Sequence, residues 1–196
     1  MSELRPTAQL TAEHDRILVL LDVLDALAKR VDTDETTPVE ARGPLGDRIE
    51  SALNLVRQYA DGLHHAKEEE FLFPRLEAQG VPREGGPLGC MLREHEAGRA
   101  LVKQMQEGLE TFRAEGLGLA FAAAASTYTD LLRGHINKEN MALFPMAEHF
   151  LGEADKQAVL ESFAEEESKF GHEVLAELLL TLDTLAAEFL SAGAAS

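Results

Sequence analysis

The chain contains HHAKEEEFLFP at residues 64–74 and repeats its pattern as HINKENMALFP at residues 135–145. Both copies read H-x-x-K-E-x-x-x-L-F-P. The dipeptide Glu-His precedes each copy, at residues 13–14 and at residues 94–95. The order is therefore EH, HxxxE, EH, HxxxE, which is an internal repeat of two units. Two such units set face to face would bring together four histidines and two glutamates, the outline of a dinuclear metal site.

Size and charge narrow the classes of function. With 196 residues and 45% apolar content, the chain can form one domain, or one domain with an appended element, around a real core. The net charge of −17 and the pI near 4.7 oppose binding to nucleic acid and to anionic lipid, because such binders carry a basic footprint. We expect neither nucleic acid nor a membrane as a partner.

The sequence also indicates a compartment. The opening residues lack the layout of a signal peptide, and no apolar run approaches the roughly 18 residues that cross a bilayer. Cys90 is the single cysteine, which excludes an intramolecular disulfide, a zinc ribbon and a CxxC redox motif. We therefore expect a soluble, cytoplasmic protein.

Apolar residues recur three and four positions apart through most of the chain, and strand patterns are nearly absent, which predicts an all-α fold. We expect four long helices, at about residues 7–30, 45–79 and 87–115, and from the turn marked by Gly116 and Gly118 to about residue 150. Pro74 and Pro145, each ten residues after a histidine of the repeat, should kink or end their helices.

A fifth helix, expected at about residues 153–191, has an apolar stripe that the repeat does not need. We expect two parts, a metal-binding bundle at 1–152 and an appended helix at 153–196. The appended helix should either lie across its own bundle or pair with another chain as a homodimer, because an exposed stripe of that length would associate.

The spacing explains why the repeated residues point to a metal. A step of four residues turns a helix by about 400°, so the histidine and the glutamate of each HxxxE lie on one face. Tyr128, Leu131, Ala142 and Met146 extend the face of the second pair, which directs it toward an apolar interior. Such burial is costly without a compensating partner.

The donor types favour first-row transition metals over calcium, magnesium or a thiolate site. Iron, manganese and zinc all meet this description. If both glutamates bridge two ions, each ion receives two histidines and two carboxylate oxygens. Six-coordinate iron would then have positions left for dioxygen, nitric oxide, peroxide or water.

A purely structural interpretation must be compared with this one. A single HxxxE is commonly an exposed pair that contributes about 0.2–0.5 kcal/mol. Two copies with shared K-E and L-F-P contexts favour metal ligation over two exposed surface pairs. We interpret Lys67 and Lys138 as surface partners of nearby carboxylates, and Glu13 and Glu94 as caps or acceptors for histidine N–H groups. His65 lies about 100° around the helix from His64, so we do not expect it to bind the metal.

Across about residues 8–150, these motifs resemble the hemerythrin-like, or HHE cation-binding, domain. The resemblance implies an up-down four-helix bundle that holds a non-haem di-iron centre. It assigns metal ligation to six residues: His14, His64, Glu68, His95, His135 and Glu139.

Two departures bear on function. The oxygen-carrying members have a second histidine one turn after the first in the third helix, where this chain has Arg99, and they end in H-x4-D instead of the H-x3-E that includes Glu139. Members that repair iron centres usually have a cysteine-bearing segment ahead of the bundle, which the residues before His14 do not provide. We therefore expect neither oxygen transport nor the repair role.

The sequence predicts a hemerythrin-like protein that binds two iron ions, and through them a small diatomic molecule or peroxide, in sensing or stress defence. One alternative is an enzyme that reduces peroxide or nitric oxide, which rapid multiple turnover would favour. A second is a helical interaction module with a vestigial motif, which absence of stoichiometric metal would favour.

Overall fold

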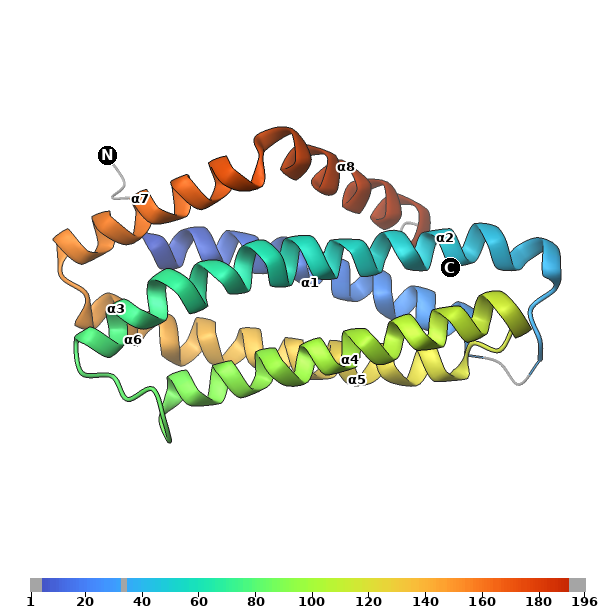
Figure 1. The fold of residues 1–196 in the computed structure, drawn as a ribbon, viewed down its shortest axis with the longest axis horizontal. Helices are drawn as coiled ribbons and strands as arrows, with labels where there is room; N and C mark the ends of the chain where they lie inside the picture. The colour runs from blue at the N-terminus through green and yellow to red at the C-terminus, as the bar shows by residue number, and fades with distance from the viewer. Residues whose placement is uncertain (1–4, 33–34, 191–196) are drawn as a thin grey trace.

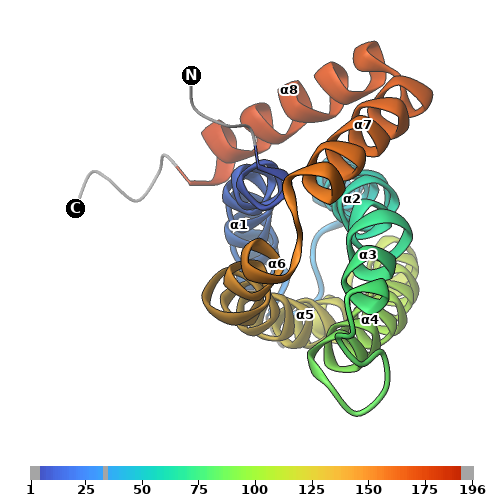
Figure 2. The same cartoon turned by 90° about the vertical axis from the view of Figure 1, so that its left-hand side faces the viewer.

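The computed structural model describes residues 5–32 and 35–190, which contain helices and loops but no strand. Four helical arms run back and forth and form a bundle (Figures 1 and 2). The first arm is α1 (Pro6–Val31) and the third is α4 (Pro87–Glu115). The second consists of α2 (Val39–Leu55), the π-helices η1 (Val56–His65) and η2 (Glu68–Leu72), and α3 (Phe73–Ala78). The fourth consists of α5 (Leu119–Lys138), the π-helix η3 (Glu139–Leu143) and α6 (Phe144–Phe150). The predicted all-α four-helix bundle is confirmed.

The second arm begins earlier than predicted. We expected its start at residue 45, after the proline, but α2 begins at Val39 and contains Pro44. The missing N–H of Pro44 would have bonded to the carbonyl of Glu40 in the first turn. Both residues are exposed, so water can bind that carbonyl and the proline is tolerated.

The prolines of the repeat interrupt their helices in an unusual way. Directly before Pro74 and Pro145 the chain makes a π-helical turn, in which the N–H of Phe73 bonds to the carbonyl of Glu68 and that of Phe144 to the carbonyl of Glu139. Each proline is then the second residue of the next α-helix, where its missing N–H is harmless. The expected interruption is therefore a π-turn that begins at each glutamate of the repeat.

The predicted single fifth helix is wrong, because the segment forms two helices, α7 (Glu153–Phe170) and α8 (His172–Phe189). Gly171 separates them with a φ of +99°, which side chains other than glycine rarely adopt. The expected end at residue 191 lies outside the described residues.

The two helices lie over the side of the bundle formed by α1 and the second arm (Figure 2). Phe163 of α7, and Leu178, Leu182 and Leu185 of α8, are buried against it. Part of the apolar stripe is thus covered by its own bundle, and pairing of this segment with another chain as a homodimer stays a prediction. The division into parts at 1–152 and 153–196 stays a prediction.

Two apolar clusters fill the bundle and leave a polar layer between them. In α1, Leu10 belongs to one cluster and Ile17 to the other, with His14 between them. In the fourth arm, Leu132 and Leu143 belong to different clusters in the same way, on either side of His135. The fold therefore places the histidines of the repeat at one level of an otherwise apolar core.

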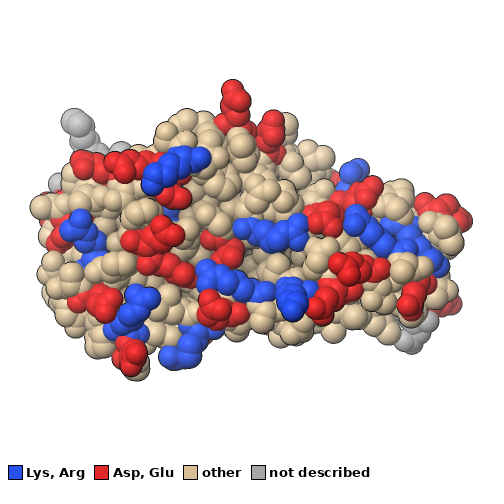
Figure 3. All heavy atoms as spheres, in the orientation of Figure 1, with Lys and Arg blue, Asp and Glu red and all other residues tan. Residues whose placement is uncertain are grey.

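Among the described residues, no helix combines the length and apolar character needed to cross a membrane. On the face shown in Figure 3, acidic and basic side chains lie next to one another. Ion pairs between such side chains occur among the described residues, including Arg57 with Glu50 and Arg99 with Asp61.

Candidate metal centre

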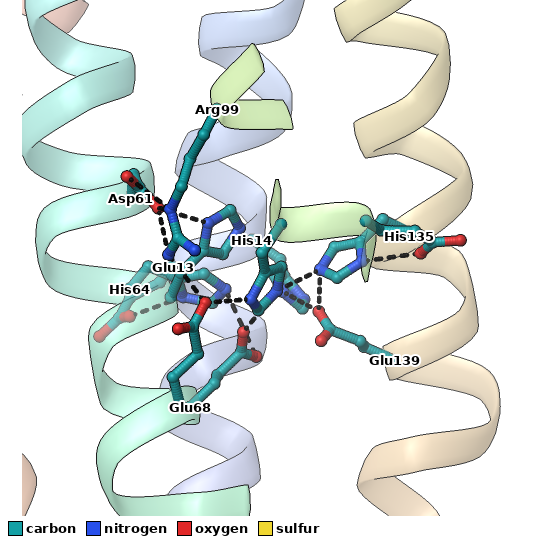
Figure 4. A network of polar contacts seen from close by, with 12 residues as sticks. Glu13, His14, Asp61, His64, Glu68, Arg99, His135 and Glu139 are labelled. Atoms are coloured by element: carbon teal, nitrogen blue, oxygen red, sulfur yellow. Dashed lines mark hydrogen bonds and ion pairs between the residues drawn. The ribbon is translucent and has the colours of Figure 1, made fainter. Parts of the chain in front are cut away.

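Six side chains with metal-binding chemistry meet in the polar layer between the two apolar clusters (Figure 4). They come from all four arms, and each is 1% exposed or less: His14, His64, Glu68, His95, His135 and Glu139. The structure thus brings together the six residues singled out in the sequence.

The donor atoms of these six side chains and of His65 form two overlapping groups, and within each group these atoms lie within 4.8 Å of one another. One group consists of His14, His64, Glu68 and Glu139. The other consists of His65, Glu68, His95 and His135. Glu68 belongs to both. Oε2 of Glu139 lies 3.1 Å from Nε2 of His14 and 3.3 Å from Nε2 of His135, so it also faces both. The arrangement has room for two cations that share carboxylates.

Each of the four predicted histidines makes a hydrogen bond through Nδ1. The acceptors are Asn140 Oδ1 for His14 at 2.9 Å, Glu13 Oε2 for His64 at 2.9 Å, Glu69 Oε1 for His95 at 2.6 Å and Glu94 Oε2 for His135 at 3.0 Å. Carboxylate and amide oxygens only accept, so we assign the proton to Nδ1. A neutral ring then has a free lone pair on Nε2, as a metal ligand requires.

Equivalent positions of the two repeats supply these acceptors. The glutamate of each Glu-His dipeptide accepts from the histidine of the following HxxxE, as expected for Glu13 and Glu94. The residue directly after each HxxxE glutamate, Glu69 or Asn140, accepts from the Glu-His histidine of the other unit. The repeat therefore fixes the orientation of the rings as well as their positions.

Several atoms at the centre have no hydrogen-bond partner among the described residues. They are Nε2 of His14, Nε2 of His64 and both carboxylate oxygens of Glu68 and of Glu139. Nε2 of His95 and Nε2 of His135 face each other at 3.1 Å, although neither can donate in a neutral ring protonated on Nδ1. Buried polar atoms normally have partners, and a buried charge costs several kcal/mol without one. Two cations would satisfy all these atoms, so the donor set fits a dinuclear metal site.

The pKa values of the two glutamates are shifted in opposite directions. Burial, with the charge of neighbouring Glu139, holds the pKa of Glu68 well above its ordinary value. Burial also acts on Glu139, but the adjacent imidazole rings of His135 and His14 outweigh it and hold the pKa of that carboxyl well below its ordinary value. The protein atoms alone thus favour one charged carboxylate of the two. A cation between them would allow both to ionise.

His65 was not expected at the centre, yet it is 4% exposed and one of its nitrogens belongs to the second donor group. Its ring stacks on that of His95, with centroids 3.9 Å apart and an angle of 15° between the planes. Burial, followed by the charge of His95, holds the pKa of His65 well below its ordinary value, so the ring is neutral at neutral pH. The expectation assumed that a side chain about 100° around the helix from His64 lies outside the centre, whereas the bundle buries both His64 and His65, which ends the π-helix η1. Asp61, four residues earlier in the sequence, was the signal that could have identified His65 as a residue of the centre.

The prediction that Lys67 lies on the surface is also wrong. Its side chain has no exposed surface, and Nζ lies 2.5 Å from Oε1 of Glu13 and 2.6 Å from Oε1 of Glu167 in α7. The ammonium also lies 5.5 Å from the centre of the Phe163 ring. Lys67 is buried because α7 covers this side of the bundle. Lys138, its counterpart, is 44% exposed and pairs with Glu94, so that prediction is confirmed.

A cavity of about 150 Å³ adjoins the second donor group. His65 and His95 line it beside Tyr128 and the ion pair of Arg99 with Asp61. Arg99 donates to Asp61 from Nε at 2.9 and 3.2 Å, and to Glu69 from Nη2 at 2.8 Å. Figure 4 shows Arg99 and Asp61 next to the centre. A small molecule in this cavity would meet imidazole rings, a phenol and a guanidinium.

Two comparisons with known proteins agree with this geometry. The family model of the hemerythrin HHE cation binding domain matches residues 5–147, a range that includes all six predicted side chains. The chain is also 32% identical over 115 residues to the iron-sulfur cluster repair protein DnrN of Neisseria gonorrhoeae, which covers 56% of this chain and 67% of that protein. A bundle with this centre and a family match over most of its length leads to one conclusion: the chain belongs to the hemerythrin HHE cation binding domain family.

Proposed function

We propose that this protein holds two iron ions at the centre of its bundle and binds a small diatomic molecule or peroxide there, in sensing or stress defence. The observation that carries the proposal is the set of buried nitrogen and carboxylate atoms that have no partner within the described chain. His14 and His64 would hold one ion, His95 and His135 the other, and Glu68 and Glu139 would serve both.

Iron in such a site supplies open coordination positions and a change of oxidation state. The residues of the chain do the remaining work. Glu13 and Glu94 hold the rings of His64 and His135 with Nε2 inward. The two apolar clusters exclude bulk water from the centre.

The size of the cavity supports the proposal that the ligand is a small molecule. At about 150 Å³ it is well below the roughly 300–1,000 Å³ of pockets that take drug-sized molecules. Arg99 and Tyr128 would offer hydrogen-bond donors to a polar or anionic guest, while the neighbouring Val56 and Val102 contribute apolar wall. Dioxygen, nitric oxide and peroxide all suit these dimensions.

Two assignments of the physiological role remain candidates besides sensing. An enzyme that reduces peroxide or nitric oxide would use the same centre with electrons delivered from elsewhere. Repair of iron-sulfur clusters is supported by the name of the Neisseria relative, and contrary to our sequence expectation we retain it on that ground. The cytoplasmic location and the absence of nucleic-acid and membrane partners stay predictions.

The test is anaerobic purification followed by elemental analysis and absorption spectra before and after dioxygen, nitric oxide and peroxide. We expect about two iron ions per chain and spectral changes with at least one of the three molecules. Rapid multiple turnover would assign the enzyme role instead. Less than about one metal ion per chain after iron supplementation would refute the proposal and favour an interaction module with a vestigial motif.

A further inference from the structure

We propose that His65 is a third imidazole donor for the cation held by His95 and His135, so that the two metal positions of the centre are chemically unequal. This inference rests on the proposed dinuclear centre and deepens it. It adds a ligand that the repeat does not contain, because the second unit has Ile136 at the position equivalent to His65.

The first argument is position. A nitrogen of His65 lies within 4.8 Å of donor atoms of Glu68, His95 and His135, and all four side chains are buried. Donors about 2.1 Å from one ion can be at most about 4.2 Å apart, so a small adjustment is enough to bring them to a common cation. The His65 ring stacks on His95 and meets His135 edge-on at a centroid distance of 5.7 Å.

The second argument is orientation. Nδ1 of His65 lies 3.3 Å from Oδ1 of Asp61, one turn earlier on the same helical arm. A carboxylate on Nδ1 is also what holds His64, His95 and His135. Asp61 is itself fixed by Arg99, which donates to both of its oxygens. His65 thus has the same kind of support as the predicted ligands, which leaves Nε2 as its metal-binding nitrogen.

The third argument is the difference between the two sides. The group around His14 and His64 contains two imidazoles, whereas the group around His95 and His135 contains three with His65. The three-imidazole side is also the one that the cavity adjoins. The cation on that side should therefore be held more tightly, while lying nearer to the entering molecule.

The competing explanation is that His65 only fills space and stacks on His95. Two variants separate these roles. His65→Phe keeps a stacked ring and removes both nitrogens, whereas His65→Ala opens a space that free imidazole can enter. His172→Ala is the matched control, because His172 is an exposed histidine at the start of α8. Circular dichroism establishes that each variant is folded.

The measurements are iron content, the kinetics of iron removal by a chelator and Mössbauer spectra of protein loaded with iron-57. Loss of an outer partner of a ligand already weakens metal binding about 10–100-fold. We therefore expect one of the two ions to leave at least about tenfold faster in both His65 variants, with no change in the control. Millimolar imidazole should restore retention in His65→Ala and not in His65→Phe.

The native protein gives a readout that needs no variant. We expect two quadrupole doublets of equal area, because the two iron ions have different numbers of nitrogen donors. Native protein that binds two ions while both His65 variants retain them at the native rate would overturn this inference and leave the proposed function standing. A single doublet from native protein with two ions would overturn it as well. Native protein without two ions would overturn the proposed function itself.

Discussion

Replacement of Lys67 by methionine should destabilise the protein far more than the same replacement of Lys138. The two lysines occupy equivalent positions of the repeat, and each pairs with the glutamate of a Glu-His dipeptide. Lys67 has no exposed side-chain surface, whereas Lys138 is 44% exposed. Methionine has a similar length and no charge, so both variants keep much of the packing and lose the ammonium.

The magnitudes follow from burial. Removing one partner of a buried ion pair costs about 3–5 kcal/mol, because the remaining charge is left uncompensated. The side chain of Glu167 is 26% exposed, so water relieves part of this loss and we expect the lower end of that range. An exposed pair contributes about 0–1 kcal/mol, which is the expected cost of Lys138→Met. For a chain of this size, Tm should fall by about 6–12 °C in Lys67→Met and by less than about 4 °C in Lys138→Met.

The assay is thermal and urea unfolding of metal-free protein, followed by circular dichroism. Metal-free protein is used so that differences in iron loading do not contribute. A double variant, Glu13→Gln with Lys67→Met, removes the uncompensated charge and should regain part of the lost stability. Equal losses of stability in the two single lysine variants would refute the reasoning, because burial would then have no effect on the stability that the ion pair contributes.

Three further predictions concern the centre and the turn between α7 and α8. Replacing Glu68 and Glu139 together by alanine should reduce bound iron to less than about one ion per chain in elemental analysis, and unchanged iron content would exclude them as ligands. Acid should release the metal, since neutral imidazole is the ligand and protons compete with the ion around and below the free histidine pKa of about 6.5. Iron retention after desalting at stepped pH measures this release, and a flat profile down to strongly acidic pH would contradict it. Gly171→Ala should cost about 1–3 kcal/mol in urea unfolding, because the φ of +99° strains any residue with a Cβ, and an unchanged midpoint would show that the turn can relax.

The ligand positions could be predicted from the sequence because they depend on local geometry. A histidine and a glutamate four residues apart share a helix face, and the apolar residues on either side direct that face inward. His135 and Glu139 meet this description, and the structure buries both. The acceptors Glu13 and Glu94 were predicted on a different ground, namely that a buried imidazole N–H needs a partner.

The errors have a different physical origin. His65 was placed outside the centre because it lies about 100° around the helix from His64, but the bundle buries a face of this arm that is wide enough to include both rings. The break at Gly171 was missed because the apolar stripe continues in phase through it, and a stripe does not report the backbone angle. The burial of Lys67 depends on where α7 packs, and no local pattern in the repeat contains that information.

The two halves of the repeat therefore share a motif but differ in the hydrogen bonds that hold their histidines. From His135 the hydrogen bonds lead through Glu94 to Lys138 and end at the surface. From His64 they lead through Glu13 to Lys67 and then to Glu167 of α7. The appended helices consequently do more than cover an apolar stripe. They keep water from the ammonium that fixes the acceptor of His64, so a chain without α7 would retain all six proposed ligands but hold His64 less firmly than the full chain does.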